Sequence, residues 1–237
     1  MTNLRVMQPR RRVSPETVEK FRIIPAAVIS DCMSRLAAGG AELRPMHGGG
    51  KVLAGPAFTV KTGPGDNLFV HKAIDTAHPG DILVVDAGGD LTNAIVGEMM
   101  LTHAETRGIA GVVIYGAIRD YGHVKNHTFP VFAAGVTHRG PLHDGPGEIN
   151  VPIAINGMVI EPGDLMIGDD DGLMCIPYDE TELVYPHAAK RLAGENAQRE
   201  RVRNGPVDRR WIDDCLANLL ADRAGALRHA PEMRRQP

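Results

Sequence analysis

One apolar run constrains the fold of this chain more than any other feature. Residues 111–118 form a short run that is rich in β-branched side chains and flanked by glycine. Such a run is typical of a buried strand, and a similar run at residues 82–86 predicts a second one. A helical pattern over residues 98–106 lies between them. Strands that alternate with helical segments predict an α/β fold with parallel strands.

Capping and turn residues predict the other elements. Ser14-Pro15-Glu16 places a capping serine before a proline, which predicts the start of a helix. Asn156-Gly157 between two apolar runs predicts a hairpin with a type I′ turn. The remaining predicted elements are helices over residues 26–38, 67–74, 179–204 and 211–220, and strands over residues 57–62, 131–134, 151–155, 158–160, 165–167 and 173–176. The part after residue 145 is therefore expected to be β-rich and then helical.

Composition argues against several classes of protein. The chain has 237 residues, of which 43% are hydrophobic, enough for a large domain with a buried core. Its formal net charge of −3 argues against nucleic-acid binding. The sequence shows no apolar stretch typical of a signal peptide or a transmembrane helix, so no membrane partner is expected. The widely spaced Cys32, Cys175 and Cys215 suggest reduced thiols and a cytoplasmic location.

A charged pair stands where the strand over residues 111–118 is expected to end. Arg119 and Asp120 follow it directly, and ligands of α/β folds collect at the carboxyl ends of strands. Gly97-Glu98 lies upstream, with twenty residues between Glu98 and Arg119. A helix that starts near Gly97 would offer unpaired N–H groups to an anion that Arg119 also binds. Asp120 and Glu98 could then hold a hard cation, although a surface ion pair explains the spacing equally well.

Three weaker candidates have ordinary structural explanations. Residues 86–90 resemble the glycine-rich turn of a nucleotide-dependent methyltransferase, but two adjacent glycines favour a plain strand-to-loop turn. Residues 168–172 contain three aspartates without the remaining ligands of a calcium loop, which favours a hairpin turn. His123 and His127 are four residues apart, and each is more simply a surface or packing residue.

Several sequence blocks together resemble one family. The chain is similar to the RraA-like superfamily, which includes the class II 4-hydroxy-4-methyl-2-oxoglutarate/4-carboxy-4-hydroxy-2-oxoadipate aldolases and the regulator of RNase E activity. The resemblance covers about residues 24–177 and contains, in order, Ser30-Asp31, Gly55-Pro56-Ala57, Pro79-Gly80-Asp81, Val84-Val85-Asp86, Gly97-Glu98, residues 115–120, residues 129–133, Glu161-Pro162-Gly163-Asp164 and Asp171-Gly172. It implies an α/β fold of the swivelling-domain type, a β/β/α sandwich with a C-terminal helical extension.

The predicted organisation has three parts. Residues 1–13, which include three consecutive arginines, are expected to form a flexible N-terminal tail. Residues 14–178 would form the RraA-like α/β domain. Residues 179–237 would form a C-terminal helical extension that takes part in subunit contacts.

The resemblance implies a metal-dependent site. Asp120 would hold Mg²⁺ or Mn²⁺, and Glu98 would order metal-associated water or contact the metal. A glutamate from the C-terminal helix of a neighbouring subunit would complete the site, with Glu195 as the match and Glu200 as the alternative. Arg119 would bind the pyruvoyl part of a 2-oxo acid and stabilise developing enolate charge. The sites would therefore lie between the subunits of a homotrimer or a dimer of trimers.

Other residues complete the expected site. Gly97 and the backbone amides of Met99 and Met100 would bind the substrate carboxylate. Glu98 stands where the aldolases usually carry aspartate, and His123 where the family tends to carry an acid, so both positions depart from the family pattern. His123 joins Arg119 and Glu98 as an expected catalytic residue. The leaving half of the substrate would be recognised by residues 67–71, by the surroundings of His123 and by the neighbour's C-terminal helix.

The expected reaction is the cleavage of a 4-hydroxy-2-oxo acid to pyruvate and a second carbonyl compound. Oxaloacetate would lose CO₂ through the same enolate, which a divalent ion and Arg119 would stabilise. A metal-associated water oriented by Glu98 would take the proton of the substrate hydroxyl. The alternative is a non-catalytic regulator of a ribonuclease that binds another protein, and metal-dependent release of pyruvate distinguishes the two.

Overall fold

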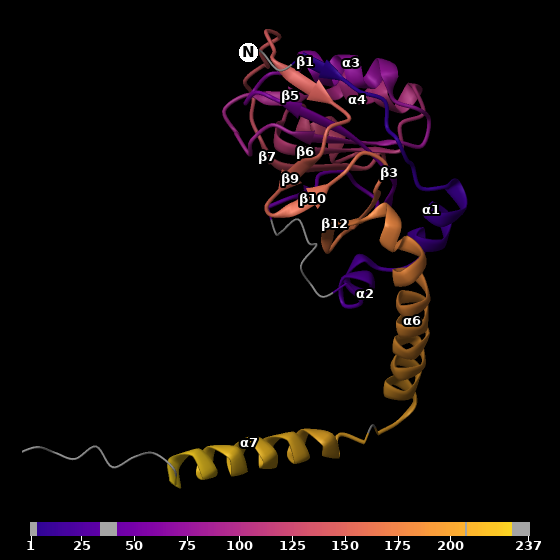
Figure 1. Cartoon of the computed structure of the whole chain (residues 1–237), viewed down its shortest axis with the longest axis vertical. Coiled ribbons are helices and arrows are strands. Elements are labelled where there is room, and N and C mark those ends of the chain that lie inside the picture. The colour runs from indigo at the N-terminus through magenta and orange to yellow at the C-terminus, as the bar shows by residue number, and fades with distance from the viewer. Residues whose placement is uncertain (1–3, 34–41, 207, 229–237) are drawn as a thin grey trace, which may run out of the picture. The chain divides into compact units, whose positions relative to one another are not determined.

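The computed structural model describes residues 4–33, 42–206 and 208–228, with side chains described through residue 221 (Figure 1). The chain divides into two compact units, Met1–Leu192 and Ala193–Pro237. The first unit contains the sheet and the helices packed on it. The second unit contains the end of α6 and all of α7.

The first helix begins where the capping pattern predicts. The Ser14 hydroxyl accepts a hydrogen bond of 3.1 Å from the Thr17 N–H, and Pro15 occupies the first turn, which needs no amide donor. The described helices are α1 Pro15–Arg22, α2 Ala26–Ser30, α3 Leu68–Thr76, α4 Glu98–Thr106, α5 Tyr121–Val124, α6 Thr181–Asn204 and α7 Arg210–Arg228, with a 3-10 turn at Tyr178–Glu180.

A large mixed sheet forms the centre of the first unit. Its path is β1-β8-β3-β4-β6-β7-β2, and β3, β4, β6 and β7 run parallel to one another. β5 pairs with the end of β6, while β11 pairs with both β3 and β12. The described strands are β1 Leu4–Val6, β2 Arg44–Pro45, β3 Leu53–Thr62, β4 Ile82–Asp86, β5 Ala94–Val96, β6 Gly111–Ile118, β7 Val131–Val136, β8 Gly147–Ile149, β9 Ile153–Ile155, β10 Met158–Ile160, β11 Leu165–Asp169 and β12 Gly172–Ile176.

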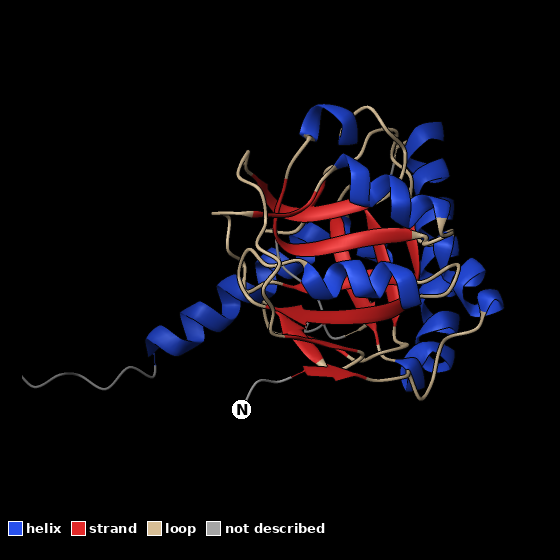
Figure 2. Cartoon of the chain, turned by 90° about the horizontal axis from the view of Figure 1, so that it is seen from above, coloured by secondary structure: helices blue, strands red, loops and turns tan. Residues whose placement is uncertain are grey.

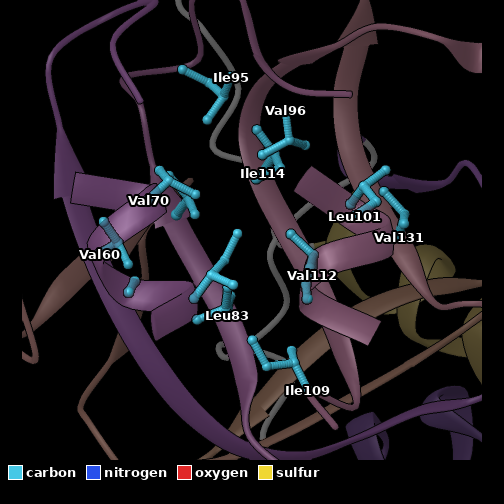
Figure 3. Close-up of a cluster of buried hydrophobic side chains, with 14 of the residues drawn as sticks. Val60, Val70, Leu83, Ile95, Val96, Leu101, Ile109, Val112, Ile114 and Val131 are labelled. Carbon is cyan, nitrogen blue, oxygen red and sulfur yellow. The ribbon is translucent and has the colours of Figure 1, made fainter. Parts of the chain in front are cut away.

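Neighbouring residues of the parallel strands face opposite sides of the sheet. Leu83 of β4 packs with residues of α3 and α4, whereas Val84 packs with residues of β9, β10 and β12. This division follows from the two-residue period of a strand. Figure 3 shows the first of these clusters, in which Val70 of α3 and Leu101 of α4 lie near the apolar side chains of the strands. Both faces of the central strands are therefore buried.

The first unit is a layered sandwich. One layer contains α3 and α4, and the next contains the parallel strands of the large sheet. The third contains the separate hairpin of β9 and β10 together with β11 and β12, which continue the large sheet from β3. Figure 2 shows the strands side by side with helices along them. A further apolar cluster joins α1, α2 and the first turns of α6 to β11 and β12, and in it the rings of Phe21 and Tyr185 meet edge to face at 5.5 Å. The predicted α/β fold, a β/β/α sandwich with a C-terminal helical extension, is confirmed.

Some boundaries differ from those predicted. β3 begins at Leu53 rather than at residue 57, because its first residues pair with β11 as well as continuing toward β4. α2 ends at Ser30, and residues 34–38 of the longer predicted helix lie outside the described residues. The turn between β9 and β10 is as predicted: Asn156 and Gly157 have φ values of 48° and 80°. Two positive φ values are what a type I′ turn requires.

The prediction of a flexible tail over residues 1–13 is wrong for residues 4–13. Leu4–Val6 forms β1, which pairs in parallel with β8 at an edge of the sheet. Arg11 donates hydrogen bonds of 2.6 Å to the carboxylates of both Glu161 and Asp179. Val13 is buried in the cluster around α1. Strand pairing and ion pairs therefore hold this segment against the domain, although its arginines had suggested a solvated tail.

The C-terminal extension is helical, as predicted. Within the second unit, four large apolar side chains in the part of α7 whose side chains are described are more than half exposed: Trp211, Leu216, Leu219 and Leu220. Of the helices in the described part of the chain, none is long and apolar enough to cross a membrane.

Candidate active site

The register of two parallel strands brings the predicted site residues together. Val96, the last residue of β5, lies opposite Ile118, the last residue of β6, and the Arg119 N–H donates to the Val96 carbonyl at 3.0 Å. The residues that follow each strand therefore lie side by side. Gly97 caps α4 directly after β5, and Arg119 and Asp120 follow β6. Glu98 and Arg119, which have twenty residues between them in the sequence, therefore lie at the same edge of the sheet.

Asp120 is held in contact with the start of α4. Its Oδ2 accepts a hydrogen bond of 2.9 Å from the Glu98 N–H and lies 3.7 Å from the Arg119 Nε. Asp120 has a φ of 55°, in the left-handed region that non-glycine residues rarely occupy. Such backbone strain occurs at functional sites, where the surrounding structure holds it in place. Here the Glu98 N–H bond is one of the contacts that hold it.

Gly97 is required because the site residues approach its backbone closely. A Cβ atom at Gly97 would lie 2.8 Å from the Arg119 Cγ and 3.0 Å from its Nε, and closer still to the Asp120 Oδ2. Its φ is −144°, an extended conformation open to any residue, so space rather than backbone freedom explains the glycine. The small residue lets the two charged side chains lie against the end of the helix.

The first turn of α4 offers unpaired amides to the same place. The Leu101 N–H makes the first helical bond, to the Gly97 carbonyl, at 3.1 Å. The amides of Met99 and Met100 precede it, in the turn where a helix supplies no acceptor of its own. Such a helix start favours an anion. Both methionines and Arg119 line one pocket of about 370 Å³.

His123 extends the site on the side of Glu98. It lies in α5, and its Nδ1 is 3.5 Å from the Glu98 Oε1. Its ring stacks on that of His127 at 5.2 Å, and the His127 Nδ1 is 3.9 Å from a carboxylate oxygen of Glu105. The structure thus brings His123 together with Glu98, and the four-residue spacing to His127 reflects two imidazoles stacked beside α4.

The donor atoms at this edge match the ligands that hard cations prefer. Asp120 and Glu98 supply carboxylate oxygens, their side chains are 42% and 50% exposed, and such oxygens are the usual ligands of Mg²⁺ and Mn²⁺. Within the described residues, however, no three His, Cys, Asp or Glu side chains form a group that could hold a metal. Asp120 and Glu98 are therefore the carboxylates at this edge that could hold a divalent cation, and further ligands would have to complete its coordination shell.

The third predicted ligand lies in the other unit. Glu195 and its alternative Glu200 both belong to the part of α6 that falls in Ala193–Pro237. Their role in the site of a neighbouring subunit stays a prediction.

Sequence reasoning missed one ionisable residue of the pocket, His143. Asn67 and His71 had been expected to contribute, and both line it, but His143 lines it as well. The His143 Nδ1 lies 2.7 Å from the Asn67 Oδ1, and its ring centroid is 6.1 Å from that of His71. Burial and, next, the neighbouring His143 lower the pKa of His71, because both disfavour the charged form of its ring. No local pattern marks His143, since it is a loop residue 76 positions from its partner.

Residues 86–90 and 168–172, the two weaker candidates for binding loops, form turns, as the sequence analysis favoured. The turn after β4 is closed by a hydrogen bond of 3.0 Å from the Gly88 N–H to the Asp86 side chain. A Cβ at Gly89 would lie 2.9 Å from the Tyr115 ring, so packing of that ring explains this glycine. The aspartates of residues 168–172 form the hairpin between β11 and β12, where the Asp169 carboxylate accepts hydrogen bonds from the Ala26 and Asp171 amides.

Comparisons with known proteins agree with the fold and show the family. The family model described as "RraA-like: Aldolase/RraA" matches residues 26–175. A Halalkalibacterium halodurans protein, provisionally named a 4-hydroxy-4-methyl-2-oxoglutarate aldolase, is 45% identical over 185 residues, which cover 78% of this chain and 87% of that protein.

Solved structures share the fold. An uncharacterized protein of Pseudomonas syringae pv. tomato superposes with a TM-score of 0.75 at 25% identity, covering 86% of this chain and 96% of that one. Streptomyces coelicolor RraAS2, described as an unusual member of the RNase ES inhibitor RraA protein family, superposes with a TM-score of 0.72 at 26% identity, covering 81% and 99%. With a family model that spans most of its first unit, the chain belongs to the RraA-like family of aldolases and RraA proteins.

Proposed function

We propose that this protein is a divalent-metal-dependent aldolase that cleaves a 4-hydroxy-2-oxo acid to pyruvate and a second carbonyl compound. One observation carries the proposal: Arg119 and the first turn of α4 line one pocket of about 370 Å³, and the Asp120 carboxylate contacts both the Glu98 N–H and the Arg119 Nε. A fixed cation, unpaired helix amides and a carboxylate are the groups needed to bind a 2-oxo acid beside a metal ion. The relative named as an aldolase supports the same reaction class.

Different residues of the chain would bind the carboxylate and the keto oxygen of the substrate. The amides of Met99 and Met100, which follow Gly97, would bind the substrate carboxylate. Arg119 would bind the 2-keto oxygen, where negative charge develops when the C3–C4 bond breaks. Removing one such preorganised donor costs about 3–4 kcal/mol of transition-state stabilisation. Oxaloacetate would lose CO₂ at the same residues, because that reaction also leaves charge on the keto oxygen.

Asp120 and Glu98 are the residues of this chain that would hold Mg²⁺ or Mn²⁺. The ion supplies a positive charge that polarises the keto group. His123 would hold a proton close to Glu98, since its Nδ1 is 3.5 Å from the Glu98 Oε1. Glu195 of a neighbouring subunit is proposed as a further ligand. That contribution places the proposed sites between subunits of a homotrimer or a dimer of trimers.

Pyruvate release from oxaloacetate and from a panel of 4-hydroxy-2-oxo acids tests the proposal. We expect turnover with Mg²⁺ or Mn²⁺ that EDTA abolishes. Asp120→Ala and Arg119→Ala should each lower it by about 1,000-fold or more, because each removes charge that stabilises the transition state. Arg139→Ala is the matched control, since Arg139 is exposed and does not line the pocket. Near-normal activity in either site variant would contradict the assignment.

The alternative is a non-catalytic regulator that binds another protein. The likeness to an RNase ES inhibitor RraA protein supports it. The same assay separates the two functions, because a regulator would release no pyruvate in a metal-dependent manner from any acid of the panel.

The place of the protein in the cell and its assembly are proposals of the same kind. A cytoplasmic location is supported by three cysteines that form no disulfide in the described residues. The exposed apolar side chains of α7, Trp211 among them, support subunit contacts through residues 179–237. Light scattering of the full chain measures its oligomeric state.

A further inference from the structure

One loop carries His143 into the pocket, and buried contacts hold this loop in place. The Asp66 side chain, only 4% of whose residue surface is exposed, accepts hydrogen bonds from the Asp144 amide at 2.6 Å and the Gly145 amide at 2.9 Å. Leu142 is bonded on both sides, since its N–H donates to the Gly65 carbonyl and its carbonyl accepts from the Asn67 N–H. The loop is therefore fixed against the start of α3, and the position of His143 is set by the fold.

The hydrogen bonds of Asn67 determine which nitrogen of His143 carries a proton. The Asn67 Nδ2 lies 2.9 Å from the Ile95 carbonyl, which can only accept, so the amide nitrogen must face it. The Asn67 Oδ1 therefore faces the His143 Nδ1 at 2.7 Å. An amide oxygen can only accept, so the His143 Nδ1 must be the donor. In the neutral ring the proton is then on Nδ1, and Nε2 carries a lone pair.

The imidazole that carries this lone pair lines the pocket that contains the anion-binding groups. His143 and Arg119 both line it, and Gly140 of the same loop lies so close to Arg119 that a Cβ there would be 3.3 Å from an Arg119 Nη atom. No residue in the described part of the chain bonds to the His143 Nε2. The pocket is thus lined by both the Arg119 guanidinium and the His143 imidazole.

We propose that the His143 Nε2, in place of the water oriented by Glu98 that the sequence led us to expect, is the base that takes the proton from the C4 hydroxyl of the substrate. This inference rests on the proposed function. As the O–H proton moves to Nε2, the C4–O bond becomes a carbonyl and the C3–C4 bond breaks. Its electron pair forms the enolate of pyruvate, whose oxygen Arg119 faces. The imidazolium then returns the proton to C3, which yields pyruvate, the carbonyl product and neutral His143, with every atom and charge accounted for.

The test compares two reactions at the same site. Aldol cleavage requires loss of a hydroxyl proton, whereas decarboxylation of oxaloacetate does not. His143→Asn keeps an N–H near the position of Nδ1, and so the bond to Asn67, but has no second nitrogen base. We expect it to lower kcat for aldol cleavage by about 100-fold or more, the usual contribution of a general base, and to lower decarboxylation at least ten times less. His138→Asn is the matched control, because His138 is exposed and does not line the pocket.

A second variant separates lost chemistry from lost structure. His143→Ala leaves room for free imidazole, which should restore aldol cleavage in proportion to its concentration and leave His138→Ala unaffected. Equal loss of both reactions in His143→Asn, or no rescue by imidazole, would overturn the role of His143 as a base. Unchanged aldol cleavage in His143→Asn would overturn it as well. If the wild-type protein releases no pyruvate from either kind of acid, the proposed function fails, and that outcome is distinct from a failure at His143 alone.

Discussion

Replacement of Gly97 by alanine separates the geometry of the site from the stability of the fold. The new Cβ would lie 2.8 Å from the Arg119 Cγ and 3.0 Å from its Nε, and closer still to the Asp120 Oδ2. The backbone of Gly97 has a φ of −144°, so alanine introduces no backbone strain. The Arg119 and Asp120 side chains are 45% and 42% exposed and can swing into solvent. The clash is therefore relieved by moving the two charged groups.

The expected cost falls on activity. Moving Asp120 breaks its bond from the Glu98 N–H, worth about 0.5–1.5 kcal/mol. Alanine returns about 0.4–1 kcal/mol by restricting the unfolded chain. The free energy of unfolding should thus change by less than about 1 kcal/mol. A displacement of reacting groups by about 1 Å instead costs about 100-fold in rate, or roughly 2.7 kcal/mol of transition-state stabilisation.

The assay follows pyruvate release with lactate dehydrogenase, alongside urea denaturation of the same preparations. Gly122→Ala is the matched control, because Gly122 is exposed in α5 and nothing lies within 4 Å of its Cβ position. We expect Gly97→Ala to lose about 100-fold in kcat/KM at near wild-type stability, and Gly122→Ala to retain both. Wild-type turnover in Gly97→Ala would refute the inference that Arg119 and Asp120 act in the positions seen beside α4.

Two further variants test stability. Asp66→Ala should lower the free energy of unfolding by about 2–4 kcal/mol in urea denaturation, because its buried carboxylate accepts hydrogen bonds from three backbone amides. Asp90 is half-buried, and among the described residues its carboxylate accepts only from the amide and hydroxyl of Thr92, so Asp90→Ala should change that free energy by less than about 1 kcal/mol. Burial and then His143 lower the pKa of His71, so unfolding takes up a proton and stability falls as the pH drops below about 6.5. His71→Gln should lose less stability than the wild-type protein between about pH 7.5 and pH 5.5, and equal losses would contradict this reasoning.

Much of the fold could be predicted from local pattern. β4 and β6 are short apolar runs with both faces buried, and the run length together with flanking glycines is enough to recognise such strands. The cap at Ser14 and the turn at Asn156-Gly157 are equally local, because a side chain within three residues or a positive φ determines each. The N-terminal segment was not predictable in this way. Its strand pairs with residues more than 140 positions away, and its arginine bonds to distant acids.

The sequence by itself determined which groups could bind an anion and a cation, since Gly97-Glu98 begins a predicted helix and Arg119-Asp120 follows a predicted strand. Tertiary structure decided that they touch, because the register of β5 on β6 places Val96 opposite Ile118. Tertiary structure alone also brought His143 to the pocket, through contacts of Asp66 and Asn67 that span about 75 residues. A functional group formed by residues adjacent in the sequence can be recognised from the sequence alone. Chemistry assembled by long-range hydrogen bonds becomes visible only when the fold brings its parts together.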